Sequence, residues 1–192
     1  RPLFGDGTVA DPSVYRVVVP VANPDTQRDL IRLAAASAHA HADEGTPELV
    51  AVNVLQVTGE PSQQNVAAER LEHQYDLLAA SREIAAEMDV SLRTRAVTGQ
   101  RVDETIVEVL AEEAPDQAIV GWQGAPPEDG SLFSPHIDAV VAEAPCELSV
   151  VTFHDDDIGS PVALAGPGPH SAVAARRAVD FATVEGTTPT LV

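Results

Sequence analysis

The sequence predicts an α/β fold, an open, doubly wound sheet of five parallel strands with helices on both faces. Short apolar, β-branched runs alternate along the chain with longer segments whose apolar residues recur at helical spacing. That alternation is typical of a parallel sheet whose strands are connected by helices. Right-handed crossovers then place the helices on both faces. A partial repetition near the end of the chain predicts the start of a second copy of this unit.

Five apolar runs are the expected strands, and the segments between them are the expected helices. The first run, residues 17–21, is dominated by valine and is followed by Asn23 and Pro24, as expected for a strand buried on both faces. The other strands are expected at residues 49–57, 91–97, 118–120 and 148–153, and the helices at 25–42, 63–88, 102–115 and 134–144. The expected inward residues are Leu30, Leu33, Ala34, Ser37 and Ala38 in the first helix, and Val66, Leu71, Leu77, Leu78, Ile84 and Ala85 in the second.

The end of the chain repeats part of the first unit. Residues 44–50 and 185–192 both run from Glu-Gly-Thr through a proline into apolar residues, and each follows a strand, a loop and an alanine-rich helix. A chance likeness of turn residues is the alternative. A strand-helix-strand piece cannot bury its own apolar face, so we expect it to pack against the first unit or another chain. The expected division is a linker over 1–14, a first domain over 15–153, an acidic linker over 154–160 and a partial second copy over 161–192.

The single cysteine, Cys146, excludes an intrachain disulfide and favours a reducing compartment. It is expected to be a small buried residue. No apolar run approaches the roughly 18 residues that a membrane helix needs, and no signal peptide is recognisable. We therefore expect a cytoplasmic segment that does not itself insert into a membrane. The opening at Arg1 and Pro2 looks like a linker within a longer protein.

Three other polar groupings are weaker candidates for a site. His39 and His41 lie two residues apart on a helix and face different directions, which favours a solvated face over metal ligation. Residues 154–157 carry carboxylates that suit a hard cation, but an acidic linker is the expectation. Residues 166–170 are expected as a turn, because their prolines remove amides that a phosphate needs. The familiar hydrolase, Walker and zinc-protease motifs do not occur, so we expect no catalytic residue and no metal.

A glycine motif precedes the fourth expected helix. Gly121-Trp122-Gln123-Gly124 follows the fourth strand, nine residues separate Gly124 from Ser134-Pro135, and Ala144-Pro145-Cys146 precedes the last strand. Glycines let backbone amides approach phosphate oxygens, and the start of a helix favours an anion. Ser134 is placed to cap that helix. The motif suits an anion site beyond the carboxyl ends of strands one and four; the alternative, that the glycines only shape the turn, stays open.

This pattern resembles the signature of the universal stress protein family, which reads Gly-x-x-Gly, nine residues, then Gly followed by Ser or Thr. The resemblance covers about residues 15 to 153. It implies the strand order 3-2-1-4-5 and a site for ATP or another adenine nucleotide. The site residues that it implies on this chain are Val21, Ala22, Asn23, Gly121, Trp122, Gly124, Ser134 and Pro135.

Two departures from the family pattern make the implied site degenerate. Ser134-Pro135 stands where the pattern has Gly-Ser or Gly-Thr, so one flexible residue gains a side chain and the next loses its amide donor. Ala22 stands where nucleotide-binding members carry an Asp, and a carboxylate that accepts hydrogen bonds from the ligand is lost. Glu128 and Asp129 add negative charge near the motif, which disfavours a triphosphate.

A first strand that ends in Val-Ala-Asn-Pro, with a linker before it and a truncated copy after it, is similar to family members fused to the C-terminal cytoplasmic end of transporters for amino acids, cationic ones in particular. The resemblance implies a non-catalytic regulatory, sensing or dimerisation domain. Its partners would be the covalently linked membrane part of the transporter and a second copy, joined as a homodimer through sheet edges. The alternative is a stand-alone tandem universal stress protein that binds or slowly hydrolyses ATP.

The chain is strongly acidic. It has 30 acidic and 11 basic residues and a formal charge of −19, and every basic residue is Arg. It lacks the Lys/Arg footprint that binds phosphate backbones, so we expect no nucleic-acid partner. Self-repulsion destabilises the compact state in dilute buffer, whereas molar salt shortens the screening length to about 3 Å. We therefore expect a salt-rich, haloarchaeal cytoplasm; a merely acidic soluble protein is the alternative.

The stability of the folded chain should rise with salt. Because ions screen the repulsion among the carboxylates, the thermal unfolding midpoint should be higher in about 1 M KCl than in about 0.05 M KCl. Circular dichroism measures both midpoints on the same protein. A midpoint that does not rise between the two would contradict the halophilic interpretation.

Overall fold

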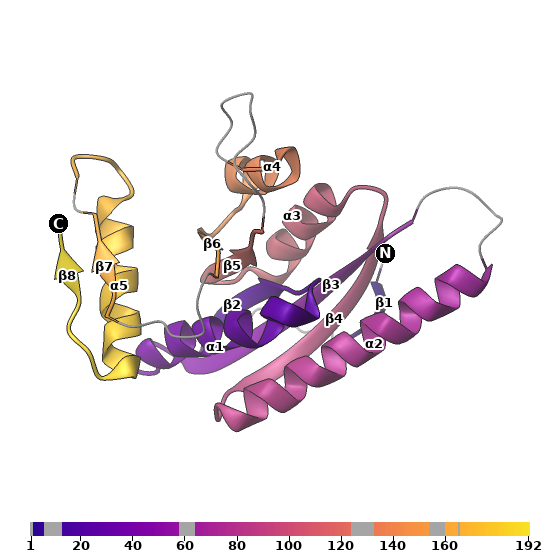
Figure 1. The fold of residues 1–192 in the computed structure, drawn as a ribbon, viewed down its shortest axis with the longest axis horizontal. Coiled ribbons are helices and arrows are strands. Elements are labelled where there is room, and N and C mark those ends of the chain that lie inside the picture. Colours follow the sequence, from indigo (N-terminus) through magenta and orange to yellow (C-terminus); the bar gives the residue numbers. More distant parts are fainter. Residues whose placement is uncertain (1, 6–12, 58–63, 124–132, 154–159, 165) are drawn as a thin grey trace.

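The expected strands form one parallel sheet. In a computed structural model that describes residues 2–5, 13–57, 64–123, 133–153, 160–164 and 166–192, these strands are β2 (Val14–Pro20), β3 (Thr46–Gln56), β4 (Ser91–Gly99), β5 (Gln117–Gly121) and β6 (Glu147–Val151). Their order is β4-β3-β2-β5-β6, which confirms the expected order 3-2-1-4-5 (Figure 1). Each neighbouring pair among them is parallel.

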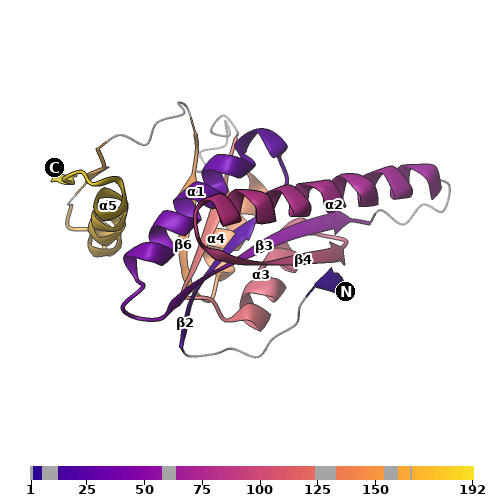
Figure 2. The same cartoon turned by 90° about the horizontal axis from the view of Figure 1, so that it is seen from below.

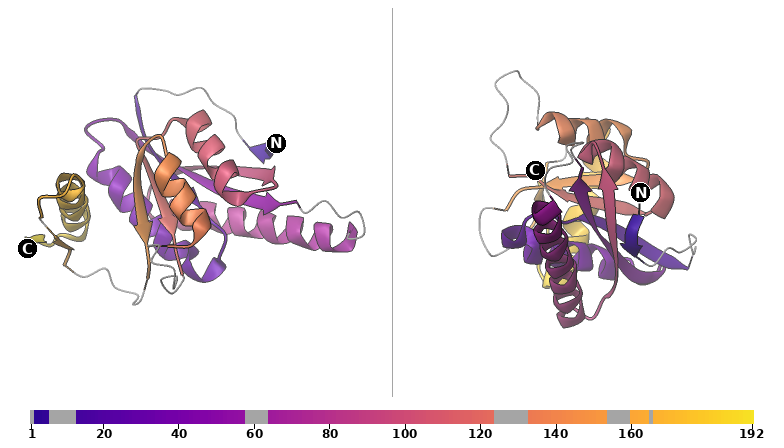
Figure 3. Two further views of the ribbon diagram at one scale, coloured as in Figure 1. Left: turned by 90° about the horizontal axis from the view of Figure 1, so that it is seen from above. Right: turned by 90° about the vertical axis from the view of Figure 1, so that its right-hand side faces the viewer.

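Four helices cover the two faces of this sheet: α1 (Pro24–Ala40), α2 (Gln64–Glu87), α3 (Val102–Glu113) and α4 (Pro135–Glu143). Helices α1 and α2 lie on one face and α3 and α4 on the other (Figures 2 and 3). The alternation along β2 explains this division. Val17 and Val19 are buried in the cluster with α1 and α2, and Val18 is buried in the cluster with α3 and α4. A strand that is apolar on both faces thus packs against both helical layers.

The inward residues expected in α1 are all buried. In α2, Leu71 is 38% exposed, so its assignment to the inward stripe was wrong, and the buried side chain nearby is Gln74. Gln74 donates a hydrogen bond to the Asn53 carbonyl of β3 at 3.2 Å. Further along, Gln27 of α1 donates to the Ser81 hydroxyl at 2.6 Å. Part of the inner side of α2 is therefore polar, which a search for an apolar stripe does not detect.

The rest of the expected α2 stripe is mixed. Leu77, Leu78 and Ala85 are buried, and Ile84 is partly buried against the same cluster. Val66 lies outside the residues whose side chains are described. The second half of α2 therefore provides its apolar contact with α1 and the sheet.

A short strand, β1 (Pro2–Gly5), lies at one edge of the sheet and pairs antiparallel with β4. It falls within the expected linker over residues 1–14, so this part of the linker is a strand. The pairing joins Phe4 to Ala96, far apart along the chain. Local composition near the N-terminus therefore does not reveal it, because the partner strand supplies the hydrogen bonds.

The last part of the chain is a strand, a helix and a strand, as expected for residues 161–192. Strands β7 (Val162–Ala163) and β8 (Thr190–Leu191) pair in parallel and are connected by α5 (Ser171–Glu185). The expected turn over residues 166–170 precedes α5. Figure 1 shows this group beside the C-terminal end of α1. Its interpretation as a partial second copy stays a prediction, and residues 154–159 lie outside the described residues.

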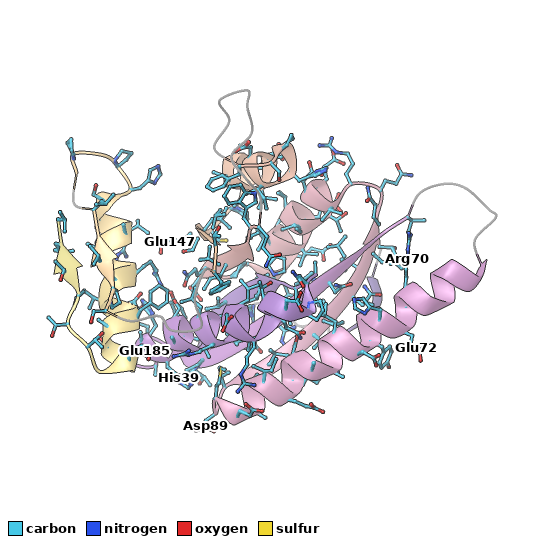
Figure 4. The ribbon with its side chains drawn as sticks, in the orientation of Figure 1. His39, Arg70, Glu72, Asp89, Glu147 and Glu185 are labelled. Carbon is cyan, nitrogen blue, oxygen red and sulfur yellow. The ribbon has the colours of Figure 1, made fainter. Side chains whose placement is uncertain are left out.

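Arg177 joins α5 to the first domain. Its guanidinium donates to Ser37 Oγ at 2.9 Å and to Gln117 Oε1 at 3.0 Å, and it pairs with Glu147 at 2.8 Å and Asp180 at 2.9 Å. The Arg177 side chain is buried, and Figure 4 shows Glu147 on the side of β6 that faces α5. Because Gln117 and Glu147 begin β5 and β6, α5 docks at the amino ends of the strands.

His41 lies in the same contact, so its assignment to a solvated face was wrong. Its ring stacks on Tyr15 with centroids 4.2 Å apart, and its Nδ1 lies 2.9 Å from the Ser37 carbonyl oxygen. Its Nε2 is 4.0 Å from the Asp180 carboxylate of α5. His39 points elsewhere, with Nε2 at 3.0 Å from the Met88 carbonyl. The covering of the end of α1 by α5 is a tertiary contact that the spacing of the two histidines does not indicate.

Replacement of Arg177 by alanine should destabilise the chain, because it leaves buried partners without the guanidinium. Removal of one side of a buried ion pair costs about 3–5 kcal/mol in the free energy of unfolding. The adjacent Arg176 is the matched control, since it pairs with the same Glu147 but is 60% exposed, and its loss should cost less than about 1 kcal/mol. Urea unfolding of both variants measures the difference. Equal losses would contradict the role assigned to Arg177.

Candidate functional site

The carboxyl ends of β2 and β3 are held together by Asn53. Its Nδ2 donates to the Val21 carbonyl at 2.6 Å, and the Val21 amide donates to the Val52 carbonyl at 2.8 Å. Val21 is buried, whereas Ala22, the next residue, is exposed. Asn53 therefore fixes the backbone at the point where the chain leaves β2.

Asn23 connects the end of β2 to the loop after β5. Its Oδ1 accepts a hydrogen bond from the Asp25 amide at 2.9 Å and so caps α1. Its Nδ2 donates to Gln123 Oε1 at 2.8 Å. The ends of the first and fourth parallel strands therefore meet, as the sequence predicts.

The first half of the glycine motif is used by contacts within the fold. A Cβ atom on Gly121 would lie 3.0 Å from a terminal carbon of Leu30, so the missing side chain makes room for α1. The Trp122 amide donates to the Val151 carbonyl at 2.8 Å, and its ring packs edge-on against Phe133 with centroids 5.3 Å apart. Gly124 lies outside the described residues. Leu30 thus occupies the space beside Gly121, and the Trp122 amide is not available to a phosphate.

Ser134 is the N-cap of α4, as expected. Its hydroxyl accepts from the Ile137 amide at 3.5 Å, and Pro135 follows as the first helical residue. Proline suits this position but has no N–H group. The start of α4 therefore offers one amide fewer to an anion than an ordinary helix does.

A buried carboxylate faces the start of α4. Asp103 of α3 is 2% exposed, and its Oδ1 lies 3.4 Å from Nδ1 of His136. Burial favours a higher pKa for Asp103, but the hydrogen bond and charge of Arg101, at 2.6 Å, outweigh it and hold the pKa below its ordinary value. The carboxylate is thus ionised at neutral pH and adds negative charge beside the helix start. Sequence reasoning missed this pair, because α3 and α4 meet only in the folded chain.

A cavity of about 420 Å³ lies beside the ends of β2 and β3. Its size falls at the lower end of the range of about 300–1,000 Å³ that is common for small-molecule sites. Among the described residues of the expected site, Ala22 is the one that lines it. The lining residues are Ala22, Asn53, Val54, Leu55, Arg70, His73 and Gln74.

Most of this lining was missed from the sequence. The available signal was Asn53, a polar residue within an otherwise apolar strand. Arg70 and His73 stand three residues apart on α2 and so share a face of the helix. Arg70 and His73 lie near Asn53 because of how α2 packs on β3. The spacing of residues along the chain does not predict that packing.

Cys146, before β6, is partly buried and packs against the cluster under α3 and α4. Burial and the negative charges of Asp116 and Glu147 raise the pKa of its thiol to about 11. The thiol is therefore protonated at neutral pH and is a poor nucleophile. This agrees with the structural role expected for Cys146.

The described helices include none that combines the length and the apolar character needed to cross a membrane. In the same part of the chain, no three His, Cys, Asp or Glu side chains gather as ligands for a metal ion.

Comparison with known proteins gives the family and the fold. A sequence model of the universal stress protein family matches residues 14–152. Among solved structures, the chain is similar to universal stress protein UspA from Lactobacillus plantarum, with a TM-score of 0.54 and 20% identity over 71% of this chain and 96% of that one. The chain is also similar to a universal stress protein from Archaeoglobus fulgidus, with a TM-score of 0.52 and 13% identity over 70% of this chain and 91% of that one. No curated protein sequence matches.

A universal stress protein solved in complex with cAMP gives a TM-score of 0.51 and 19% identity, over 72% of this chain and 97% of that one. At these identities the likeness to solved structures shows the fold of the chain.

Proposed function

The chain belongs to the universal stress protein family, and we propose that its first domain is a non-catalytic regulatory module that binds an adenine nucleotide. The observation that carries this proposal is the cavity of about 420 Å³ at the carboxyl ends of β2 and β3. Ligands of open α/β sheets bind at this end, next to the point where the strand order reverses. The similar protein solved with cAMP supports an adenine nucleotide as the ligand class.

The chemistry of the cavity lining favours binding over catalysis. Its polar side chains among the described residues are one arginine, one histidine and two amides. This set holds neither a carboxylate nor a hydroxyl or thiol nucleophile beside a base, which acid–base and covalent catalysis use. Sensing of a nucleotide is therefore the better supported role, and slow ATP hydrolysis by a tandem protein is the alternative.

The partners expected from the sequence belong to this proposal. Attachment to the cytoplasmic end of an amino-acid transporter is supported by the family resemblance at the end of the first strand. Recovery of the full-length native protein in the soluble fraction after cell lysis would contradict the attachment. A homodimer through the sheet edges would use β6 or β1, which are the two edge strands of the described sheet. A monomer mass by light scattering would contradict the homodimer.

Nucleotide titration of the full chain tests the proposed function. We expect saturable binding of AMP, cAMP or ATP by isothermal calorimetry, together with a change in the fluorescence of Trp122, the sole tryptophan. Incubation with ATP should release no phosphate. Absence of saturable binding, with the fold retained by circular dichroism, would contradict the nucleotide site, and steady phosphate release would favour the alternative.

A further inference from the structure

Arg70 differs from the other described arginines in having no partner among the residues that the structure describes. Arg82 hydrogen-bonds the Thr94 hydroxyl. Within the described part of the chain, Arg70 has neither an ion pair nor a hydrogen bond. In a chain of formal charge −19, an unpaired guanidinium is the exception. The arginines that pair with carboxylates are Arg16, Arg28, Arg32, Arg93, Arg95, Arg101, Arg176 and Arg177.

The unpaired guanidinium lines the cavity. Arg70 and His73 come from one face of α2 and lie opposite the end of β3. Figure 4 shows Arg70 on the side of α2 nearer β3, and Glu72 on the opposite side of the helix. Residues two apart on a helix do not face each other, so the Glu72 carboxylate points away from Arg70. Among the residues whose side chains are described, none neutralises the positive charge that Arg70 brings to the cavity.

Gln74 is the buried polar residue of the cavity lining. Its side chain is 2% exposed, and its Nε2 donates to the Asn53 carbonyl. Its Oε1 is buried and has no hydrogen-bond partner among the described residues. Buried acceptors in native proteins are nearly always paired with a protein, water or ligand donor. The group that the cavity itself offers to a ligand is therefore the Arg70 guanidinium, with His73 beside it.

The site that the family signature implies for phosphate is poorly suited to it here. The Trp122 amide is bonded to Val151, and Pro135 has no amide hydrogen. Asp103 is ionised beside the start of α4 and repels an anion. A phosphate is thus better placed on the side of the cavity that α2 forms.

From these contacts, and resting on the proposed function, we infer that the cavity takes a nucleoside monophosphate whose phosphate is held by Arg70 and His73 of α2. An arginine binds a phosphate through two parallel hydrogen bonds, and a neighbouring histidine adds a third donor. A monophosphate fits the modest volume of the cavity, and the net charge of the chain opposes the larger negative charge of a triphosphate.

Calorimetry with AMP and adenosine tests this inference on the full chain. In the wild type, AMP should bind more tightly than adenosine. Arg70→Gln should weaken AMP binding by roughly tenfold, the loss of a charge-assisted hydrogen bond, and leave adenosine binding unchanged. His73→Gln is the second variant and should act in the same direction. Arg176→Gln removes the same charge at the opposite end of the strands and should bind AMP as the wild type does.

The outcomes separate this inference from the proposed function. If Arg70→Gln and His73→Gln bind AMP as tightly as the wild type does, α2 does not hold the phosphate, and the inference is overturned. The nucleotide site of the proposed function would still stand, because the wild type binds both AMP and adenosine. A loss of AMP binding confined to Ser134→Ala would place the phosphate at α4 and overturn the inference in the same way. Failure of the wild type to bind either ligand would overturn both. Circular dichroism of each variant confirms that the fold is retained.

Discussion

The parallel pairing of β2 with both β3 and β5 is the constraint on which the rest of this structure depends. It brings the carboxyl ends of β2, β3 and β5 together. There, Asn53 donates a hydrogen bond to the Val21 carbonyl and Asn23 donates one to Gln123. Because β2 is apolar on both faces, it also fixes the two helical layers on either side. The cavity lies where this central strand ends and α2 passes over β3.

The two ends of the strands have different partners. At the amino ends, α5 inserts Arg177 among the buried groups of β5 and α1, where its guanidinium donates to Ser37 and Gln117. Arg177 Nε and Asp180 Oδ2 are buried there with no hydrogen-bond partner among the described residues. At the carboxyl ends, Arg70 and the carbonyl of Gln74 have no partner in the described structure. The α5 contact and the candidate cavity therefore lie at opposite ends of the strands.

A large part of the fold can be predicted from the sequence, because the strands are buried on both faces. Runs such as residues 17–21 carry the signal of a central parallel strand in their composition alone. What escapes prediction depends on partners distant in the chain. Strand β1 forms because β4 offers an open edge, and His41 is buried because α5 covers it. Gln74 is inside and Leu71 outside because α2 meets a polar carbonyl on β3.

The candidate site is less predictable than the fold. The motif around Gly121 and Ser134 is a true feature of the sequence, and the Ser134 cap follows from it. However, local spacing does not tell whether a glycine faces a ligand or a neighbouring helix, and Gly121 faces Leu30. The residues that line the cavity come from β3 and α2, whose approach is decided by packing. The glycine motif is thus present in the sequence, whereas the polar side chains that line the cavity come from β3 and α2.

Nuclear magnetic resonance of the ¹⁵N-labelled chain during titration with AMP would show whether the nucleotide binds between β3 and α2, since it locates the ligand residue by residue. We expect the amide signals of Ala22, Asn53 and His73 to shift together and saturate, with smaller changes at Trp122 and His136. Shifts confined to Trp122 and His136, with Asn53 and His73 unmoved, would contradict it.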